Sequence, residues 1–265
     1  MNAPPNESDV LERFAPLFVP RSVAIVGASA DGTGPGNNFL RHLRAYGFPG
    51  AIYPIHPSAK RVDGLAAYRS LAETPEPVDY AYVAIAADRV LAMIATSNGR
   101  VRFAQIMSSG FGEHPKGKQL QETLVAAARA AGVRLLGPNC MGTHSPRGRL
   151  TFVEGAQADV GSVGVLSQSG GLSIDILRRG QLRGLKFSGL VTLGNSADLG
   201  PCDLLEYLFA DPHTRVIGLY LEDVADGRRF FELLRHAGAA KPVVLLKGGR
   251  TKQGQRATAS HTGAL

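Results

Sequence analysis

Short apolar segments rich in β-branched residues alternate along this chain with loops of Gly, Ser and Asn and with longer stretches of helical spacing. Such alternation is typical of parallel sheets whose strands are joined by helices. The strand-like segments are continuously apolar, as expected for strands covered by helices on both faces. The sequence therefore predicts an α/β fold built on parallel sheets.

The alternation occurs twice, separated by a loop rich in Gly, Pro and Ser over residues 137–161. Before this loop it predicts strands at residues 22–27, 51–55, 80–85, 104–107 and 134–136, and helices at 37–46, 87–97 and 118–131. After it, the pattern predicts strands at 162–166, 188–192, 216–221 and 242–246, and helices at 172–182, 201–209 and 227–237. A chain of 265 residues suits two domains. We expect a Rossmann-like domain over residues 1–145 and a second parallel α/β domain over 146–265. Because no helix is predicted after Gly248, we expect the second domain to be incomplete.

Composition and charge exclude several classes of protein. The sequence is 44% hydrophobic, too apolar for a disordered chain, and its 2 cysteines lack the spacing of a metal site or a disulfide scaffold. No membrane span is predicted, because Asp79 and Asp88 interrupt the most apolar stretch. The start of the chain lacks the pattern of a signal peptide, so we expect a cytoplasmic protein. Since the net charge of +7 is spread singly, a small phosphate-bearing ligand fits better than nucleic acid.

The loop after the first predicted strand, residues 27–36, is rich in glycine and stands where a doubly wound fold binds phosphate at a helix N-terminus. It is longer than the dinucleotide fingerprint, because Asn37 occupies the place of the third glycine. The second predicted strand does not end in the acid that holds the ribose of NAD, and Lys60 and Arg61 follow it instead. These cations suit a phosphorylated ribose, as in NADP or coenzyme A, or form a solvated basic loop.

Residues 112–119 match a P-loop as far as its lysine, but Gln119 replaces the Mg²⁺-binding Ser or Thr, and Pro115 removes a backbone donor. We interpret this segment as a loop that opens a helix. In the second half, residues 167–171 join a strand to a helix and predict an anion site made of N–H groups and hydroxyls. A serine hydrolase remains a minority reading, because Ser167 stands where the turn before a nucleophilic Ser169 needs Gly.

Two titratable residues stand at the carboxyl edge of the second predicted sheet. His261 lies among small residues after the last strand, although most histidines in such loops simply face solvent. Glu222 ends the strand at 216–221 and could hold one imidazole nitrogen while the other attacks, or could face water.

Taken together, six segments in the same order make the chain resemble the NDP-forming acyl-CoA synthetases, relatives of the succinyl-CoA synthetase α subunit. The segments are residues 20–29, 137–140, 167–171, 193–198, 220–222 and 260–263. They extend over nearly the whole chain. The resemblance implies a Rossmann-like CoA-binding domain followed by a flavodoxin-like CoA-ligase domain.

The resemblance also implies roles for single residues. His261 would be the phosphorylated histidine, Glu222 would orient it, and the helix N-terminus at Ser169, Gly170 and Gly171 would hold the phosphate. The residues implied in binding CoA or in lining the acyl and phosphate site are Gly27, Ser29, Gly34, Gly36, Lys60, Pro138 and Asn139.

The implied reaction interconverts acyl-CoA, ADP and phosphate with a carboxylic acid, CoA and ATP through an acyl phosphate and a phosphohistidine. ATP, ADP and Mg²⁺ would bind a nucleotide-grasp domain or subunit that this sequence lacks, so we expect the chain alone to bind CoA without turning over ADP, and to form an oligomer. The alternative is a CoA- or acyl-CoA-binding regulatory module of a protein acetyltransferase, in which the histidine is often lost; His261 favours catalysis. An NADP-linked oxidoreductase is a weaker third reading, since no hydride-transfer signature is found.

Overall fold

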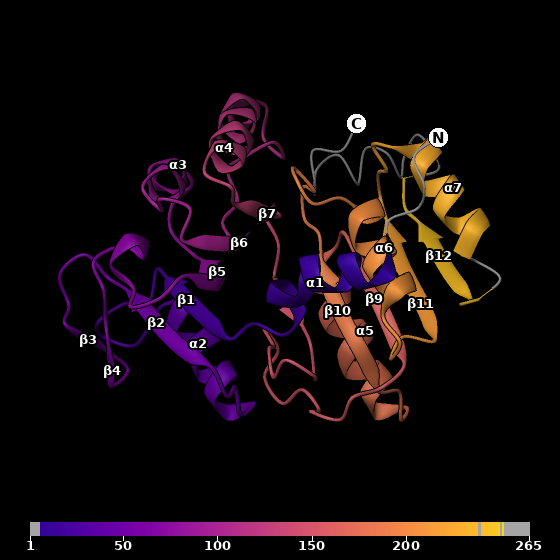
Figure 1. The fold of residues 1–265 in the computed structure, drawn as a ribbon, viewed down its shortest axis with the longest axis horizontal. Coiled ribbons are helices and arrows are strands. Elements are labelled where there is room, and N and C mark those ends of the chain that lie inside the picture. Colours follow the sequence, from indigo (N-terminus) through magenta and orange to yellow (C-terminus); the bar gives the residue numbers. More distant parts are fainter. Residues whose placement is uncertain (1–5, 238–239, 250, 252–265) are drawn as a thin grey trace.

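The computed structural model describes residues 6–237, 240–249 and 251. Two five-stranded sheets lie at its centre, the first on the left of Figure 1 and the second on the right. Each sheet is built from one half of the sequence, apart from short exchanges described below. The α/β class and the parallel sheets predicted from the sequence are confirmed.

The first sheet is entirely parallel, with strand order β2-β1-β5-β6-β7. Its strands are β1 (Ser22–Val26), β2 (Ala51–Ile55), β5 (Val78–Val83), β6 (Val101–Ile106) and β7 (Arg134–Leu136). Helices α3 (Ala87–Ala95) and α4 (Lys118–Ala130) share a core with one face of β1, and α2 (Pro35–Ala45) shares a core with the other. Every residue of β1 and β5 is therefore buried. A hairpin of β3 (Arg61–Val62) and β4 (Leu65–Ala66) follows β2, and a 3-10 turn, η1 (Leu71–Glu73), precedes β5.

The second sheet has the order β12-β11-β9-β10-β8, with only β8 antiparallel to its neighbour. Its strands are β8 (Thr143–His144), β9 (Val163–Ser167), β10 (Phe187–Thr192), β11 (Val216–Leu221) and β12 (Val243–Lys247). The helices between them are α5 (Gly170–Leu182), α6 (Pro201–Ala210) and α7 (Gly227–Ala237).

Both sheets reverse their strand order beside their first parallel strand. In the first sheet β1 lies between β2 and β5, and in the second β9 lies between β10 and β11. Loops leave the carboxyl ends of adjacent strands in opposite directions at such a point, which opens a crevice where α/β proteins bind ligands. The fold therefore marks two places for a site, at the loops after β1 and after β9.

Helix α1 (Glu7–Phe18) crosses from the first half of the sequence to the second domain, where it packs against α6 (Figure 1). The ring of Phe18 stacks on Tyr207 of α6 with centroids 3.8 Å apart, and Phe14 meets Phe103 of β6 at 6.0 Å. One buried core consequently runs through both domains. The packing of α1 on α6 and β6 thus joins the two domains.

The sequence pattern located the main strands and helices to within a few residues, but it missed α1, β3, β4 and β8. The predicted boundary between residues 145 and 146 stays a prediction, and β8, just before it, pairs with β10 of the second sheet. Among the described residues, no helix has both the length and the apolar character needed to cross a bilayer.

Candidate functional site

A cavity of about 330 Å³ lies between the two domains, at the switch point after β9. Its walls come from the carboxyl ends of β6 and β7 in the first domain and of β9 and β11 in the second. The lining residues are Met107, Asn139, Cys140, Met141, Gln168, Ser169, Gly170, Gly171 and Glu222. Five residues selected from the sequence thus meet here, namely Asn139, Ser169, Gly170, Gly171 and Glu222.

The N-terminus of α5 forms one wall of this cavity. Ser169 caps the helix, because its Oγ accepts a hydrogen bond from the backbone N–H of Leu172 at 3.3 Å. The N–H groups of Gly170 and Gly171 are the first two of the helix and have no acceptor inside it. A Cβ on Gly170 would lie 2.7 Å from Cγ of Met141, so glycine lets the neighbouring wall approach. The wall offers backbone donors and the positive end of a helix dipole to an anion.

The turn over Gly137, Pro138 and Asn139 forms the opposite wall. It contains a cis peptide bond before Pro138, and Asn139 adopts a left-handed backbone conformation with φ 57°. The segment after β10 packs onto this turn, since a Cβ on Gly194 would lie 2.3 Å from the carbonyl oxygen of Pro138. Asn195 donates its backbone N–H to the same oxygen at 3.0 Å. Two loops from different domains therefore fix the position of Asn139.

Glu222 follows β11 and is 9% exposed. Tyr220 donates its hydroxyl to Oε1 of Glu222 at 3.0 Å. Burial and the nearby Glu222 carboxylate raise the pKa of Tyr220 above 10, so the phenol keeps the proton that it donates. Lys247, at the end of β12, donates from Nζ to the backbone carbonyl of Glu222 at 2.5 Å. Tyr220 thus holds the carboxylate of Glu222, and Lys247 on the neighbouring strand holds its backbone, beside the cavity.

Gln168 was not selected from the sequence, yet its side chain joins both halves of the second domain's switch point. Its Oε1 accepts the backbone N–H groups of Glu222 and Asp223 at 2.5 and 2.9 Å, and its Nε2 donates to the Ser196 hydroxyl at 3.4 Å. Because Gln168 is only 6% exposed, this amide is a structural tie. The sequence signal for Gln168 was its place between the end of a strand, at Ser167, and the helix N-cap, at Ser169.

Cys140 lines the cavity and is 3% exposed, and its thiol lies against the backbone carbonyl oxygens of Ile106 and Leu136. Burial raises the pKa of this thiol to about 12, which keeps it protonated near neutral pH. Cys202 is also buried, with a pKa raised by burial to about 11. Both cysteines are therefore free, buried residues, and their spacing in the sequence likewise suits neither a metal site nor a disulfide scaffold. In the described part of the chain, no cluster of three or more His, Cys, Asp or Glu side chains is arranged to hold a metal ion.

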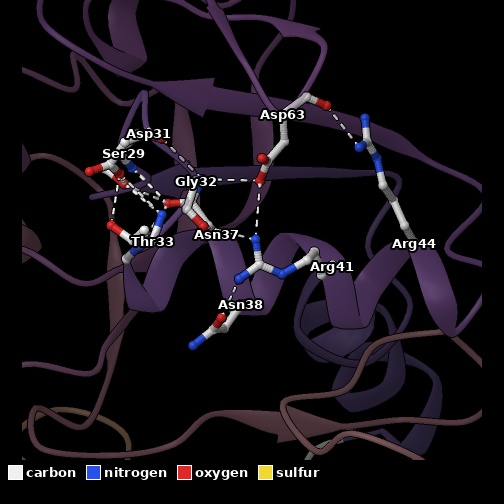
Figure 2. Close-up of polar contacts among 10 residues, drawn as sticks. Ser29, Asp31, Gly32, Thr33, Asn37, Asn38, Arg41, Arg44 and Asp63 are labelled. Atoms are coloured by element: carbon white, nitrogen blue, oxygen red, sulfur yellow. Dashed lines mark hydrogen bonds and ion pairs between the residues drawn. The ribbon is translucent and has the colours of Figure 1, made fainter.

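The glycine-rich loop after β1 is closed by its own side chains (Figure 2). The buried amide of Asn37 accepts the backbone N–H groups of Ser29 and Gly34 at 2.8 and 3.2 Å. Asp31 accepts the backbone N–H of Thr33 at 3.1 Å. A Cβ on Gly27 would lie 2.3 Å from the carbonyl oxygen of Ala84, and one on Gly36 would lie 2.6 Å from the backbone nitrogen of Ala28. These two glycines therefore allow close packing of backbone on backbone.

An acidic residue, Asp63, lies close to the glycine-rich loop although it does not end the second strand. It lies in the hairpin after β2, where Asn37 donates to its Oδ2 at 3.0 Å and Arg44 donates to its carbonyl oxygen at 2.8 Å (Figure 2). Its backbone φ of 47° and that of Gly64, 80°, form the turn between β3 and β4. The Asp-Gly pair was the available signal, since this dipeptide favours hairpin turns.

Lys60 is exposed just before β3. The turn that leads to it is stabilised by His56, whose Nδ1 accepts the N–H groups of Ser58 and Ala59 at 3.2 and 2.8 Å. Among the residues that the structure describes, Lys60 makes no ion pair with an acidic side chain. The chemistry of this cation suits the phosphate groups of a CoA-like ligand.

Two of the sequence hypotheses have plain outcomes in the structure. The P-loop-like segment is a loop with a 3-10 turn, η2 (Pro115–Gly117), leading directly into α4, as interpreted from the sequence. His261, the residue proposed as the phosphorylated histidine, lies outside the described residues.

These features define a two-domain α/β protein with a cavity between its domains, lined on one side by the N-terminus of a helix. Comparisons with known proteins agree with this class. Residues 21–146 match the model of a CoA-binding domain, and residues 160–265 match that of a succinyl-CoA ligase-like flavodoxin domain. The chain belongs to the NDP-forming acyl-CoA synthetase family.

Among its relatives is the α subunit of ADP-forming acetate–CoA ligase I from Pyrococcus furiosus, which is 37% identical over 94% of this chain. A trans-feruloyl-CoA synthase from an unknown prokaryotic organism is also 37% identical, over 94% of the chain. The chain spans 55% of the first relative's length and 36% of the second's. A solved structure, the dinucleotide-forming acetyl-coenzyme A synthetase 1 of Candidatus Korarchaeum cryptofilum in complex with phosphate and ADP, superposes with TM-score 0.87. It is 39% identical, over 95% of this chain and 55% of that chain. The chain thus corresponds to the α-subunit-like portion of these ligases.

Proposed function

We propose that this chain is the CoA-binding and phosphoryl-carrying part of an ADP-forming acyl-CoA synthetase. In the proposed reaction, acyl-CoA and inorganic phosphate give an acyl phosphate and free CoA, and the phosphoryl group then passes through His261 to ADP. The observation that carries the proposal is the shared cavity, which brings the Ser169–Gly170–Gly171 helix end, Asn139 and Glu222 together at the switch point. Family membership supports the same scheme.

The cavity supplies what phosphoryl transfer needs from a protein, which is position and charge stabilisation. The N–H groups of Gly170 and Gly171 and the amide of Asn139 would hold the phosphoryl oxygens. A nitrogen of His261 would then form a bond to phosphorus while the bond from phosphorus to the acyl oxygen breaks, and the carboxylate leaves. Glu222, held by Tyr220 and Lys247, would orient the imidazole and balance the positive charge that it gains.

Coenzyme A would enter along the first domain. Lys60 is the exposed cation suited to its ribose phosphate. Ser29 and the loop of Gly27, Gly34 and Gly36 shape the surface beside it, and Pro138 and Asn139 lie toward the cavity where the thiol would react. Because the loop amides and the Ser29 hydroxyl already form hydrogen bonds within the loop, the loop would contribute shape more than donors.

The remaining parts of the proposal concern the nucleotide, the assembly, the acid and the compartment. A nucleotide-grasp domain or subunit would bind ADP, ATP and Mg²⁺, and the assembly would be oligomeric. The identity of the acid is left open, since one relative is named for acetate and another for ferulate. Because CoA and ADP are cytoplasmic metabolites, we place the protein in the cytoplasm.

Transfer of label from [³²P]acetyl phosphate to the chain tests this function, with a parallel arm that supplies [γ-³²P]ATP and a nucleotide-grasp subunit. We expect acid-labile label on the wild type, none on His261→Ala, and normal label on His213→Ala, a matched change at an exposed histidine in the loop after α6. Absence of label on the wild type in both arms would contradict the proposal and favour a CoA-binding regulatory module. Equal labelling of His261→Ala would remove His261 from the scheme.

A further inference from the structure

A cluster of side chains joins the two domains directly beside the cavity. Asn195, in the loop after β10, donates from Nδ2 to Oε2 of Glu113 at 2.5 Å and to Oε1 of Gln121 at 3.0 Å. Glu113 belongs to the P-loop-like segment of the first domain, and Gln121 to α4. Two side-chain oxygens of the first domain, one from Glu113 and one from Gln121, thus accept hydrogen bonds from the side-chain amide of Asn195 in the second domain.

Glu113 is itself fixed in place by its own loop. Its Oε1 accepts the backbone N–H groups of Gly110 and, at 3.2 Å, Phe111. Burial disfavours the charge, but the hydrogen bonds from Asn195 and these backbone groups outweigh it and lower the pKa of Glu113. The carboxylate of Glu113 is therefore ionised, and its Oε1 accepts hydrogen bonds from the first domain while its Oε2 accepts one from the second.

Asn195 in turn contacts a residue that lines the cavity. Asn139, which lines the cavity, donates from Nδ2 toward Oδ1 of Asn195 at 3.5 Å. The next residue, Ser196, accepts a hydrogen bond from Gln168, which in turn fixes the backbone of Glu222. The loop after β10 therefore contacts a residue of each wall of the cavity, Asn139 on one side and Gln168 on the other.

We propose that Glu113 is a positioning residue for the phosphate cavity, acting through Asn195 to hold Asn139 and the Gln168–Glu222 tie in place. The inference rests on the proposed function, because it assigns a role to a residue near that same site. It also assigns a role to the P-loop-like segment, because Glu113 in this segment accepts a hydrogen bond from the side-chain amide of Asn195 in the second domain. The hydrogen bond between Asn195 and Glu113, called the clasp below, joins the two domains. The cavity then has its full geometry only while this hydrogen bond is formed.

Asn195→Asp tests the clasp with a nearly isosteric change. The new carboxylate keeps the acceptor for Asn139 but loses the donor and repels Glu113, whose oxygen is 2.5 Å away. We expect binding of inorganic phosphate, measured by calorimetry on the 265-residue chain, to weaken about tenfold, the scale on which outer positioning residues act. Adding Glu113→Gln restores a donor opposite the new carboxylate and should recover most of the binding.

Two controls separate positioning from general damage. Binding of CoA, which uses the other switch point, should change less than twofold in all variants. Asn98→Asp, a matched change at an exposed turn with φ 51°, should leave phosphate binding unaltered.

Hydrogen exchange provides a readout that does not need phosphate. The amides of residues 110–113 and 193–199 should exchange faster in Asn195→Asp and return toward wild-type rates in the double variant. Wild-type phosphate affinity in Asn195→Asp would overturn the positioning role, and so would unchanged exchange in both loops. If the wild type itself binds no phosphate, the proposed function loses its site, while hydrogen exchange still decides whether the clasp exists.

Discussion

His144 should make this protein sensitive to acid. Its ring is fully buried in β8, the strand that carries the chain from the first sheet to the second. The Nδ1 atom lies 3.0 Å from the hydroxyl of Thr151, whereas Nε2 has no hydrogen-bond partner among the described residues. Protonation would place a charge in this buried position without a counterion, so burial lowers the pKa of His144 from 6.5 to about 4.

The sign and size of the effect follow from linkage. As pH falls below 6.5, the unfolded chain takes up a proton on His144 that the folded chain refuses until about pH 4. Over that window stability falls by about 1.4 kcal/mol per pH unit, or about 3 kcal/mol in all. Above pH 6.5 the contribution vanishes, because both states are neutral.

Urea unfolding at several pH values, about 7.5 down to about 4.5, measures this term. The free energy of unfolding of the wild type should fall more steeply with acid than that of His144→Gln, by the amount given above. Other titrating groups, such as the half-buried His42, affect both proteins and cancel in the comparison. His213→Gln, at an exposed site, should keep the wild-type slope. Parallel slopes for wild type and His144→Gln would refute the reasoning.

Three further changes test individual residues. Gly36→Ala should destabilise the chain by about 2 to 3 kcal/mol in urea unfolding, because its Cβ would meet the backbone nitrogen of Ala28 at 2.6 Å. Gly171→Ala, whose Cβ would have no atom of the described residues within 4 Å, should be neutral or stabilising, and equal losses in the two variants would contradict this packing argument. Ser169→Ala should cost about 1 kcal/mol of stability through loss of the N-cap and should weaken phosphate binding; unchanged thermal unfolding would show that the cap contributes nothing. Lys60→Met should weaken binding of CoA about tenfold in calorimetry while leaving binding of dephospho-CoA unchanged; equal binding of both ligands by the wild type would remove Lys60 from the phosphate role.

The strands of both sheets were predictable because helices cover both of their faces, and burial on both faces leaves a continuous apolar run in the sequence. Helix α1 was missed although its signals were present. Asn6 caps it, acids occupy its first turn, and Val10, Phe14, Leu17 and Phe18 form an apolar stripe. Strand β8, with two residues, has no periodicity from which to be found.

The site was predictable only in part, for physical reasons. Loop chemistry and resemblance selected Asn139, Ser169 and Glu222 one by one, but their meeting in one cavity depends on how two domains pack. Contacts such as Glu113 with Asn195 join residues that lie 82 positions apart, and no local pattern encodes them. The glycines at 27 and 36 were selected for phosphate binding, and the structure adds a second reason for them, which is backbone packing.

A crystal structure of the chain with inorganic phosphate tests the central claim most directly. The account predicts phosphate in the cavity between the domains, with its oxygens within hydrogen-bond distance of the N–H groups of Gly170 and Gly171 and beside Asn139. Phosphate bound elsewhere on the chain, with this cavity filled only by water at saturating concentration, would contradict it.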